Sequence, residues 1–501
     1  MTTPATNPRA DDPNTTNPTT NPGTTNPHTS PATDPGTTNP GTTTPDATSP
    51  ATDPGATSPG TTTPDATSPA TDPGATNPDA TSPATGPATG PATGPGAGDP
   101  RLHVSAPTWA GRADAARRRL ASGELGALPV IAGLLAIAIV FQSVTHHFLQ
   151  ADNLTNITRF IAGPGLIAVG VVFVLVLGEI DLSLGSVAGA TSAIAAVLAV
   201  RQGWPEWLAI TTALAAACAI GLLHGLLFAR VGVPAFVVTL AGMLAWSGLQ
   251  EWVLGDGGTV NNRHDGIIAG LDSTFLGDGD TAYAWALAVL APALYLLTQL
   301  HTTRRRTAAG LTTRPLTDTA LRTAALAVPT LATAYTLNQD RGLPLSLVVL
   351  TAAVVTTDLT LRRTRYGRQI FALGGNVEAA RRAGINITLV RTTVFLLSAL
   401  LAGLGGLFYA SQQGSADKQL GSGNVLMMAI AAAVIGGTSL FGGRGNAWSA
   451  LLGILVIQTI TTGLDMVHAP QAIQYMITGA VLLTAVTLDS LTRHTHTTTH
   501  H

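Results

Sequence analysis

Glu179 and Asp181 are the side chains of this sequence best placed to do chemistry, because they lie between two long apolar runs in the segment "VLGEIDLSLGS". A carboxylate inside a membrane is costly unless it is paired or hydrated, so both are functional candidates. Gly178 and Gly185 flank them and suit an interrupted helix. The second half of that helix would begin with Asp181 or Ser183 as its N-cap. Such a break either lines a cavity within the membrane or is an ordinary tight turn at its cytoplasmic edge that only shapes the helix pair.

The rest of the sequence lacks the groups that enzymes need. A P-loop requires a Gly-x-x-x-x-Gly-Lys-Ser/Thr segment, and the only lysine, Lys418, lies in "SADKQL". There is no zinc motif and no Gly-x-Ser-x-Gly segment, and the adjacent His146 and His147 cannot share one helix face as metal ligands should. One cysteine, Cys218, cannot form an internal disulfide. We therefore expect no catalytic residue, metal or cofactor in this chain, and the net charge of −2 gives no reason to expect nucleic acid as a partner.

A second glycine-rich segment, "IGGTSLFGGRGN", falls at the end of another apolar run. Its glycines permit close approach of the backbone and unusual dihedral angles, so they too are candidates for the translocation path or for helix breaks. These glycines are Gly436, Gly437, Gly442 and Gly443. Two isolated polar residues on apolar helices, His224 and Gln458, are expected to form interhelical hydrogen bonds.

A compact basic segment, "RYGRQIFALGGNVEAARRAGIN", interrupts the apolar sequence. Asn376 is a favourable N-cap, and Glu378 suits the first turn of a helix and precedes Arg382 by four residues, the favourable order for an ion pair. Gly384 supplies the C-terminal stop, so a short helix is predicted over 377–383. This helix is too short to persist alone in water, and it has no catalytic groups and lies beside further arginines. We interpret it as a docking element for another protein.

Twelve apolar stretches approach the roughly 20 residues that a membrane-spanning helix needs. The pair around Gly178 has almost no loop between its members, and the segment near 321–337 is weakly apolar. The expected fold class is therefore all-α, a polytopic transmembrane helix bundle of about 10–12 spans. The stretches are 127–147, 160–178, 182–200, 206–229, 234–254, 282–300, 321–337, 343–361, 390–410, 424–440, 447–467 and 473–491.

The distribution of basic residues predicts the orientation. If the N-terminus is cytoplasmic and all twelve segments cross, nineteen arginines lie inside and five basic residues outside, in agreement with the positive-inside rule. The N- and C-termini are then both cytoplasmic. The five outside residues are Arg159, Arg201, Arg263, Arg341 and Lys418.

Composition divides the chain into four parts. Residues 1–100 hold a repeat, "PDATSPATDPGATSPGTTT", and no Leu, Ile, Val or Phe, so this low-complexity tail is expected to be disordered, and no function is assigned to it. A juxtamembrane segment, 101–126, follows. The transmembrane domain, 127–491, contains a cytoplasmic loop at 362–389, and a polar C-terminal tail, 492–501, ends the sequence.

Three of these segments together resemble the signatures of sugar-type ABC importer permeases, in the order in which that family carries them. "GRQIFALGGNVEAARRAGIN" looks like the family's cytoplasmic coupling loop, whose helix docks into a cleft on the ATP-binding subunit. "GEIDLSLGSVAG" and "GGTSLFGGRGN" resemble the other two signatures, and the similarity covers roughly residues 127–493. Glu179 after Gly178, and the extra hydrophobic pair near 282–337, look most like the xylose-type branch. The matching coupling positions are Gly374, Gly375, Asn376, Glu378, Ala379, Ala380, Arg381 and Gly384.

The resemblance implies the permease subunit of an importer for a monosaccharide, D-xylose or a related sugar, in a bacterial cell membrane. Its implied partners are ATP-binding subunits that bind the ATP, a second permease copy in a homodimer, and an extracytoplasmic sugar-binding protein. One alternative is a stand-alone secondary transporter driven by an ion gradient, with Glu179 and Asp181 as proton sites. Another is a membrane scaffold that transports nothing.

Overall fold

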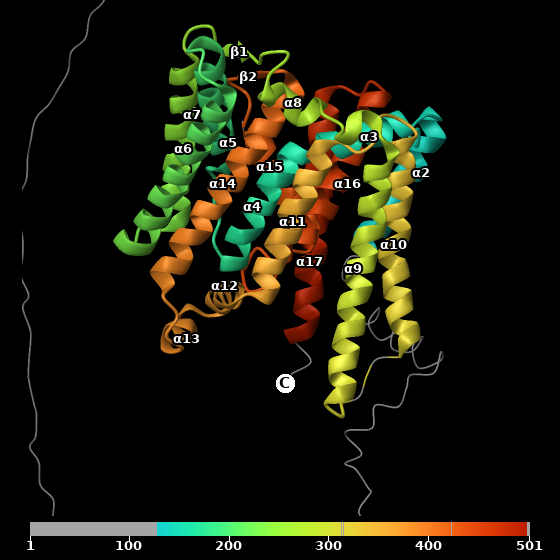
Figure 1. Ribbon diagram of the computed structural model, residues 1–501. Coiled ribbons are helices and arrows are strands. Elements are labelled where there is room, and N and C mark those ends of the chain that lie inside the picture. The colour runs from blue at the N-terminus through green and yellow to red at the C-terminus, as the bar shows by residue number, and fades with distance from the viewer. Residues whose placement is uncertain (1–127, 312, 314, 422, 498–501) are drawn as a thin grey trace, which may run out of the picture. The chain divides into compact units, whose positions relative to one another are not determined.

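The computed structural model describes residues 128–497 of the 501-residue chain, apart from Thr312, Arg314 and Ser422. The predicted low-complexity tail, the juxtamembrane segment and residues 498–501 lie outside this described part. Within it the chain is mostly helical, as the expected all-α class requires (Figure 1). Two short strands, β1 Thr259–Asn261 and β2 Ser415–Asp417, pair in antiparallel register.

Each of the twelve predicted stretches forms a helix, and the last one continues into the predicted polar tail. These helices are α2 Leu128–Thr145, α4 Ala162–Leu177, α5 Leu184–Ala196, α6 Glu206–Leu226, α7 Ala235–Leu254, α9 Thr281–Ala308, α10 Leu316–Asn338, α11 Leu345–Arg363, α14 Ile387–Gln413, α15 Gly423–Ile435, α16 Ala447–Met466 and α17 Gln471–Thr497. Shorter helical segments lie between them. These are α3 Ala151–Phe160, α8 Ile267–Ser273, α12 Arg365–Gly375, α13 Val377–Arg382, the π turns η1 Val197–Arg201 and η2 Leu227–Val231, and the 3-10 turn η3 Leu276–Gly279.

By length and composition, eight helices of the described residues can cross a membrane, or nine if α3 and α4, which meet at 43°, form one bent span. This number is below the ten to twelve expected from the sequence. One reason is that α15 has only 13 residues, fewer than the ~20 that an α-helix needs to cross the hydrocarbon layer. Another is that α10 mixes its apolar residues with Asp318, Arg322 and several threonines. The chain is therefore a multi-pass membrane protein in which some apolar helices are shorter or more polar than a full span.

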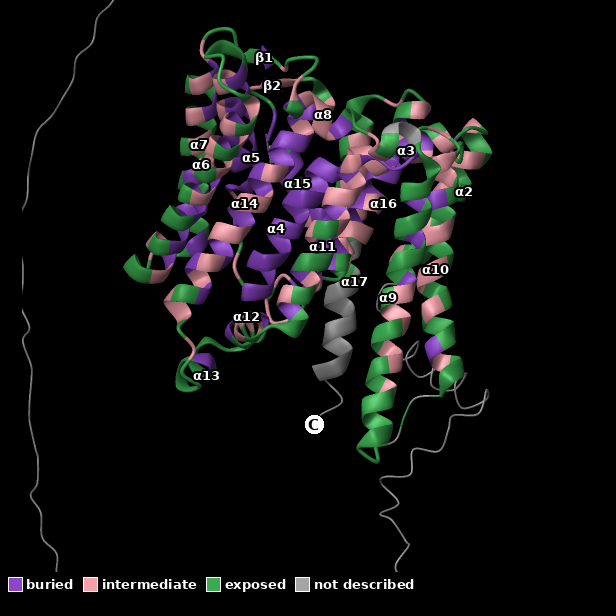
Figure 2. Ribbon diagram, in the orientation of Figure 1, coloured by how far each residue is buried: buried purple, intermediate pink, exposed green. Residues whose placement is uncertain are grey.

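α4 forms the centre of the bundle, and all 16 of its residues are buried. Its sequence is apolar on every side, as a helix surrounded by other helices requires. α14 packs along α4, α5 and α6, while α15 and α16 cover other faces of α4. Figure 2 shows this buried centre, with exposed residues along α6, α7, α9 and α10. Large apolar side chains on those outer faces, such as Leu244 and Leu297, are exposed, as expected for helices that face lipid.

α9 and α10 pack on each other as a hairpin at the side of the bundle. A small cluster that includes Ala284, Ala288, Ala334 and Leu337 joins the start of α9 to the end of α10. The same cluster includes Leu343, just before α11, so the hairpin is attached to α11 at this level. Farther along α9, towards its C-terminus, the hairpin stands apart from α11 (Figure 1).

The bundle has two distinct ends, which we call the strand end, with β1, β2 and α8, and the α13 end, with α12 and α13 (Figure 1). Basic residues separate between them as the sequence predicts. At the strand end, Arg159 forms an ion pair with Asp272 of α8, and Arg201 donates a hydrogen bond to the Leu254 carbonyl oxygen (2.6 Å). Arg381 and Arg391, which are among the predicted inside residues, belong to α13 and the start of α14.

Candidate coupling site

α13 begins as the sequence predicts, with a capped first turn. The Asn376 side chain accepts a hydrogen bond from the Ala379 N–H (2.9 Å), which satisfies one of the free amides at the helix start. Glu378 forms ion pairs with both Arg381 and Arg382, each at 3.4 Å. These pairs are exposed to solvent, so they contribute little to stability and leave the carboxylate and guanidinium groups accessible.

The C-terminal end of α13 also matches the prediction. Gly384 adopts a left-handed conformation (φ 77°). Its N–H bonds to the Arg381 carbonyl oxygen (3.0 Å), and the Ile385 N–H bonds to the Ala380 carbonyl oxygen (3.1 Å), which is the Schellman arrangement of a helix end. Of the six residues of α13, only Ala380 is buried. The helix therefore has one anchored side and presents its remaining side chains to the surroundings.

α12 was missed by the sequence reasoning, which predicted a helix only after Asn376. It is capped by Thr364, whose hydroxyl accepts a hydrogen bond from the Gly367 N–H (3.0 Å). Its buried residues, Gly367, Ile370 and Leu373, are spaced three apart and form one face. This periodicity is the signal that would have found the helix. α12 contacts α4 and α11, so it lies between the bundle core and α13 and connects the two.

The three glycine-bearing segments meet at one point next to α12. The Gly443 N–H donates a hydrogen bond to the Val176 carbonyl oxygen at the end of α4 (3.0 Å). Gly374 lies so close to the same carbonyl that a Cβ atom there would overlap it and would be 2.9 Å from the Gly443 nitrogen. A Cβ on Gly442 would lie 2.7 Å from the Gly178 Cα. Because only a residue without a Cβ permits such backbone approach, we call this contact of α4, α12 and the 436–446 loop the glycine junction.

The junction contains some of the predicted glycines and not others. Gly375 lies beside Gly443 in it. By contrast, Gly436 packs against the backbone of α16, and Gly185 packs against the loop before α15. Gly437 ends α15 in a left-handed conformation (φ 102°). The sequence placed these segments at one edge of the bundle but contained no signal that three of them touch.

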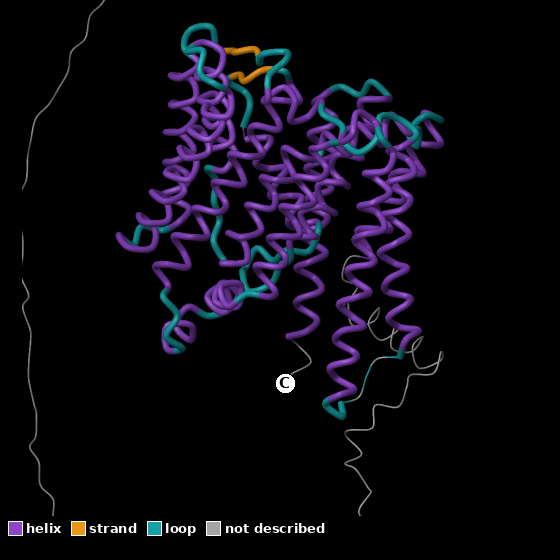
Figure 3. The backbone as a smooth tube through the Cα atoms, in the orientation of Figure 1, coloured by secondary structure: helices purple, strands orange, loops and turns teal. Residues whose placement is uncertain are grey.

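The connection between α4 and α5, for which the sequence allowed an interrupted helix or a tight turn, is a non-helical segment that we call the helix break. Residues 178–183 are non-helical, and the chain runs as a loop there (Figure 3). Asp181 is buried, and one of its carboxylate oxygens accepts hydrogen bonds from the Ser183 N–H (2.8 Å) and the Ser183 hydroxyl (2.6 Å). Of the two predicted N-caps, Ser183 occupies the N-cap position, although its side chain forms no capping bond to the helix. Asp181 instead fixes the turn that leads into α5.

A buried hydrogen-bond chain continues from this turn into two further helices. The Ser183 hydroxyl lies 3.3 Å from Nδ1 of His224 on α6, and the Trp246 indole N–H of α7 donates to His224 Nε2 (2.9 Å). Since an indole nitrogen only donates, Nε2 accepts and Nδ1 carries the imidazole proton. His224 therefore forms the predicted interhelical bond. Gln458 bonds instead to Thr462 of its own helix, and no bond to another helix is seen among the described residues.

Glu179 pairs with Arg391 at the N-terminal end of α14, with 3.7 Å between the carboxylate oxygen and the guanidinium nitrogen. The same guanidinium lies over the Phe228 ring, 4.2 Å from its centroid. Burial raises the pKa of Glu179, and the positive charge of Arg391 opposes that shift. Both acids singled out from the sequence thus have partners. Asp181 bonds within the helix break, and Glu179 ties the break to α14.

The chain matches a known protein family and several of its members. Residues 153–486 match a family described as branched-chain amino acid transport system / permease component. A xylose transport system permease protein (XylH) of Escherichia coli strain K12 is 35% identical over 376 residues, which are 75% of this chain and 94% of that protein. The XylH of Haemophilus influenzae is 33% identical over 72% of this chain and 96% of that protein. A ribose import permease protein (RbsC) of Bacillus subtilis is 30% identical over 73% of this chain and 94% of that protein. No solved structure matches.

Proposed function

We propose that this chain, which belongs to the family of transport-system permease components, forms the membrane pathway of an importer for D-xylose or a closely related monosaccharide. The chain is the permease component of a sugar ABC importer of the xylose and ribose type. Such a component is a transport subunit and not an enzyme, it binds no cofactor, and ATP is hydrolysed by a separate chain. The choice of xylose over ribose rests on the higher identity to XylH, 35% against 30% for RbsC.

The observation that carries the mechanism is the position of α13. A helix of six residues with capped ends, one buried anchor and exposed charges has the form of a docking element. We assign it the contact with the ATP-binding subunit. The glycine junction joins its supporting helix α12 to the end of α4, so a force on α13 is passed to the buried centre of the bundle through backbone contacts.

The assignment of α13 also sets the proposed orientation. The α13 end faces the cytoplasm, where ATP is available, and the strand end faces outwards, towards a sugar-binding protein. The separation of basic residues between the two ends supports this orientation through the positive-inside rule. The chain would then sit in a bacterial plasma membrane with cytoplasmic termini. We include a second copy of the chain as the partner that completes the pathway.

The helix break at 178–183 is the proposed gate region. Its acids are held by Ser183 and Arg391. These partners suit a structural role more than a proton-carrying one, so a secondary transporter has no specific support. ATP binding shifts the protein between two states only if contacts at α13 differ between them.

Transport in a reconstituted system tests the proposal. The chain is placed in liposomes with its ATP-binding subunit inside and its binding protein outside, and uptake of labelled D-xylose is measured with and without internal ATP. We expect uptake that needs ATP and survives collapse of the proton gradient, and we expect unlabelled D-xylose to compete better than D-ribose. Loss of uptake on collapse of the gradient with ATP present would contradict ATP coupling. Stronger competition by ribose would contradict the sugar assignment alone.

A further inference from the structure

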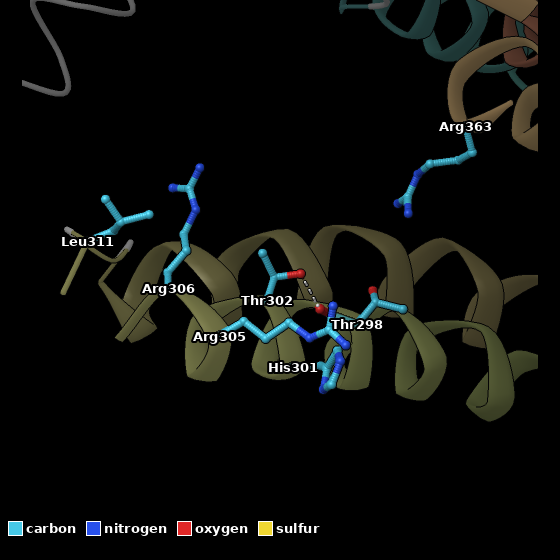
Figure 4. A pocket seen from close by; sticks show the side chains of 7 residues that line it. All are labelled: Thr298, His301, Thr302, Arg305, Arg306, Leu311 and Arg363. Atoms are coloured by element: carbon cyan, nitrogen blue, oxygen red, sulfur yellow. Dashed lines mark hydrogen bonds between the residues drawn. The ribbon is translucent and has the colours of Figure 1, made fainter. Parts of the chain in front are cut away.

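A basic cavity of about 530 Å³ lies between the end of α9 and the end of α11, at the α13 end of the bundle. Figure 4 shows the side chains that line it, with Arg363 of α11 directed across the space towards α9. The lining residues are Thr298, His301, Thr302, Arg305, Arg306, Leu311 and Arg363. Cationic groups thus line this cavity from two helices that are far apart in the sequence.

The arginines of this cavity have no ionic partner among the described residues. The ion pairs there involve other arginines, including the neighbouring Arg362, which pairs with Asp358 at 2.8 Å. Three guanidinium groups line this one cavity, and each would attract an anion bound there. Arginine also binds phosphate through two parallel hydrogen bonds, which makes this set suited to a phosphate group.

An apolar stripe on α9 leads towards the cavity. Leu290, Leu294 and Leu297 have exposed fractions of 49%, 52% and 60%. Their spacing of four and three residues places them on one face of the helix, and His301 continues that face at the cavity. An apolar stripe that ends in cationic groups matches a phospholipid, which has acyl chains next to a charged headgroup.

We propose that this cavity binds the phosphate-bearing headgroup of an anionic membrane phospholipid, with an acyl chain along the Leu290–Leu297 stripe. α9 has 28 residues, so its basic last turns extend beyond the roughly 20 residues that cross the hydrocarbon layer and lie at headgroup level. The lipid fills the space between the α9–α10 hairpin and α11, and its headgroup links Arg305 and Arg306 to Arg363. A free phosphate ion would neutralise the same arginines but would leave the leucine stripe without an occupant.

Ligand-dependent thermal unfolding of the full-length protein in a neutral detergent tests this site. Dioctanoyl phosphatidylglycerol is added as the probe, and dioctanoyl phosphatidylcholine and inorganic phosphate are added in parallel samples. We expect phosphatidylglycerol to raise the melting temperature in a saturable way and the other two to have much smaller effects. An equal shift with inorganic phosphate would overturn the assignment to a lipid and indicate a site for a free anion.

Matched variants separate the cavity from general surface charge. Arg305→Gln and Arg363→Gln should each weaken the apparent affinity for phosphatidylglycerol roughly fivefold, the scale expected for one basic residue at an anionic lipid surface. Arg304→Gln removes the same charge from the adjacent position on α9, outside the cavity lining, and should leave the affinity unchanged. If Arg304→Gln weakens binding as much as Arg305→Gln, the attraction is diffuse and the proposed site does not exist.

A second copy of the chain is the other possible cover for the leucine stripe. Leu294→Cys in a Cys218→Ser background places a single thiol on the stripe, because Cys218 is the only native cysteine. After oxidation of native membranes, we expect this thiol to form no disulfide bond between two copies of the chain. A disulfide-linked dimer would contradict the lipid proposal and assign the stripe to contact between copies.

Discussion

Arg391 of α14 reaches Glu179 in the break between α4 and α5, with 3.7 Å between Nη2 and Oε1. Only four residues, 383–386, separate α14 from the end of α13, and the N-cap of α14, Asn386, accepts a hydrogen bond from the Leu389 N–H (3.0 Å). The ion pair therefore joins α14, the helix that follows the proposed docking helix α13, to the helix break that we assign to gating. This side-chain contact is a second connection to the end of α4, in addition to the backbone contacts of the glycine junction.

Removing this ion pair should loosen the coupling between ATP hydrolysis and transport. Glu179→Gln and Arg391→Gln are each expected to lower the amount of sugar transported per ATP hydrolysed. Their effects on this ratio should be non-additive, because residues in direct contact share one interaction. The measurement is uptake and ATP hydrolysis in the same proteoliposomes for both single variants and the double variant.

The control for this pair is Arg362→Gln, which removes an ion pair with Asp358 on a single helix. That change should leave the transport-to-hydrolysis ratio at the wild-type value. Strictly additive effects of Glu179→Gln and Arg391→Gln would show that the two residues act independently, and the proposed link between α14 and the helix break would be wrong.

A methyl group at Gly374 should disrupt the glycine junction. The added Cβ would overlap the Val176 carbonyl oxygen, so the Gly374→Ala protein must shift α12 or the end of α4. Overpacking of this kind costs about 1–3 kcal/mol. We expect a lower melting temperature in detergent and weaker coupling of ATP hydrolysis to transport.

Gly375→Ala is the matched control, since a Cβ at Gly375 would meet no atom within 4 Å. The same substitution one residue farther on should leave the melting temperature unchanged or slightly higher, because alanine favours helix more than glycine does. Equal destabilisation by the two changes would mean that the close approach at Gly374 does not determine the packing.

The local features of α13 could be predicted because they depend on residues a few positions apart. Asn376, Glu378 and Gly384 act on backbone groups within one or two turns, and short-range rules cover such contacts. α12 was predictable in principle from its buried residues, but one of these is a glycine, and Arg368 and Gln369 beside it weaken the apolar pattern.

The glycine junction lies beyond sequence reasoning for a physical reason. It consists of backbone atoms of Val176, Gly374 and Gly443, which the fold brings together from three distant segments. A glycine in the sequence indicates freedom or close approach, but it does not identify the partner. Gln458 shows the same limit, because the choice between Thr462 on its own helix and a partner on another helix depends on packing.

Trp246→Phe should destabilise the protein through the buried imidazole of His224. The change keeps an aromatic ring beside His224 but removes the indole N–H that donates to Nε2. An acceptor left unpaired in a buried position costs about 1–3 kcal/mol. We expect a lower melting temperature, and a smaller effect in Trp246→Phe/His224→Phe, in which both partners are replaced by apolar rings.

Trp252→Phe on the same helix, with 80% of the Trp252 side chain exposed, should have no effect. A stable Trp246→Phe protein would mean that the bond contributes nothing.

Glu378→Arg should separate docking from folding. Glu378 is exposed, and its ion pairs with Arg381 and Arg382 are solvent-screened, so reversing its charge should change the melting temperature little. On the docking surface, however, it places a third arginine among two others, and charge reversal at an interface costs several kcal/mol. We expect loss of co-purification with the ATP-binding subunit and loss of ATP-driven uptake, with normal insertion into the membrane.

Glu251→Arg, the same change at an exposed position on α7 near the strand end, should retain co-purification. If Glu378→Arg binds the ATP-binding subunit and supports uptake as the native chain does, α13 is not the contact through which ATP hydrolysis drives transport.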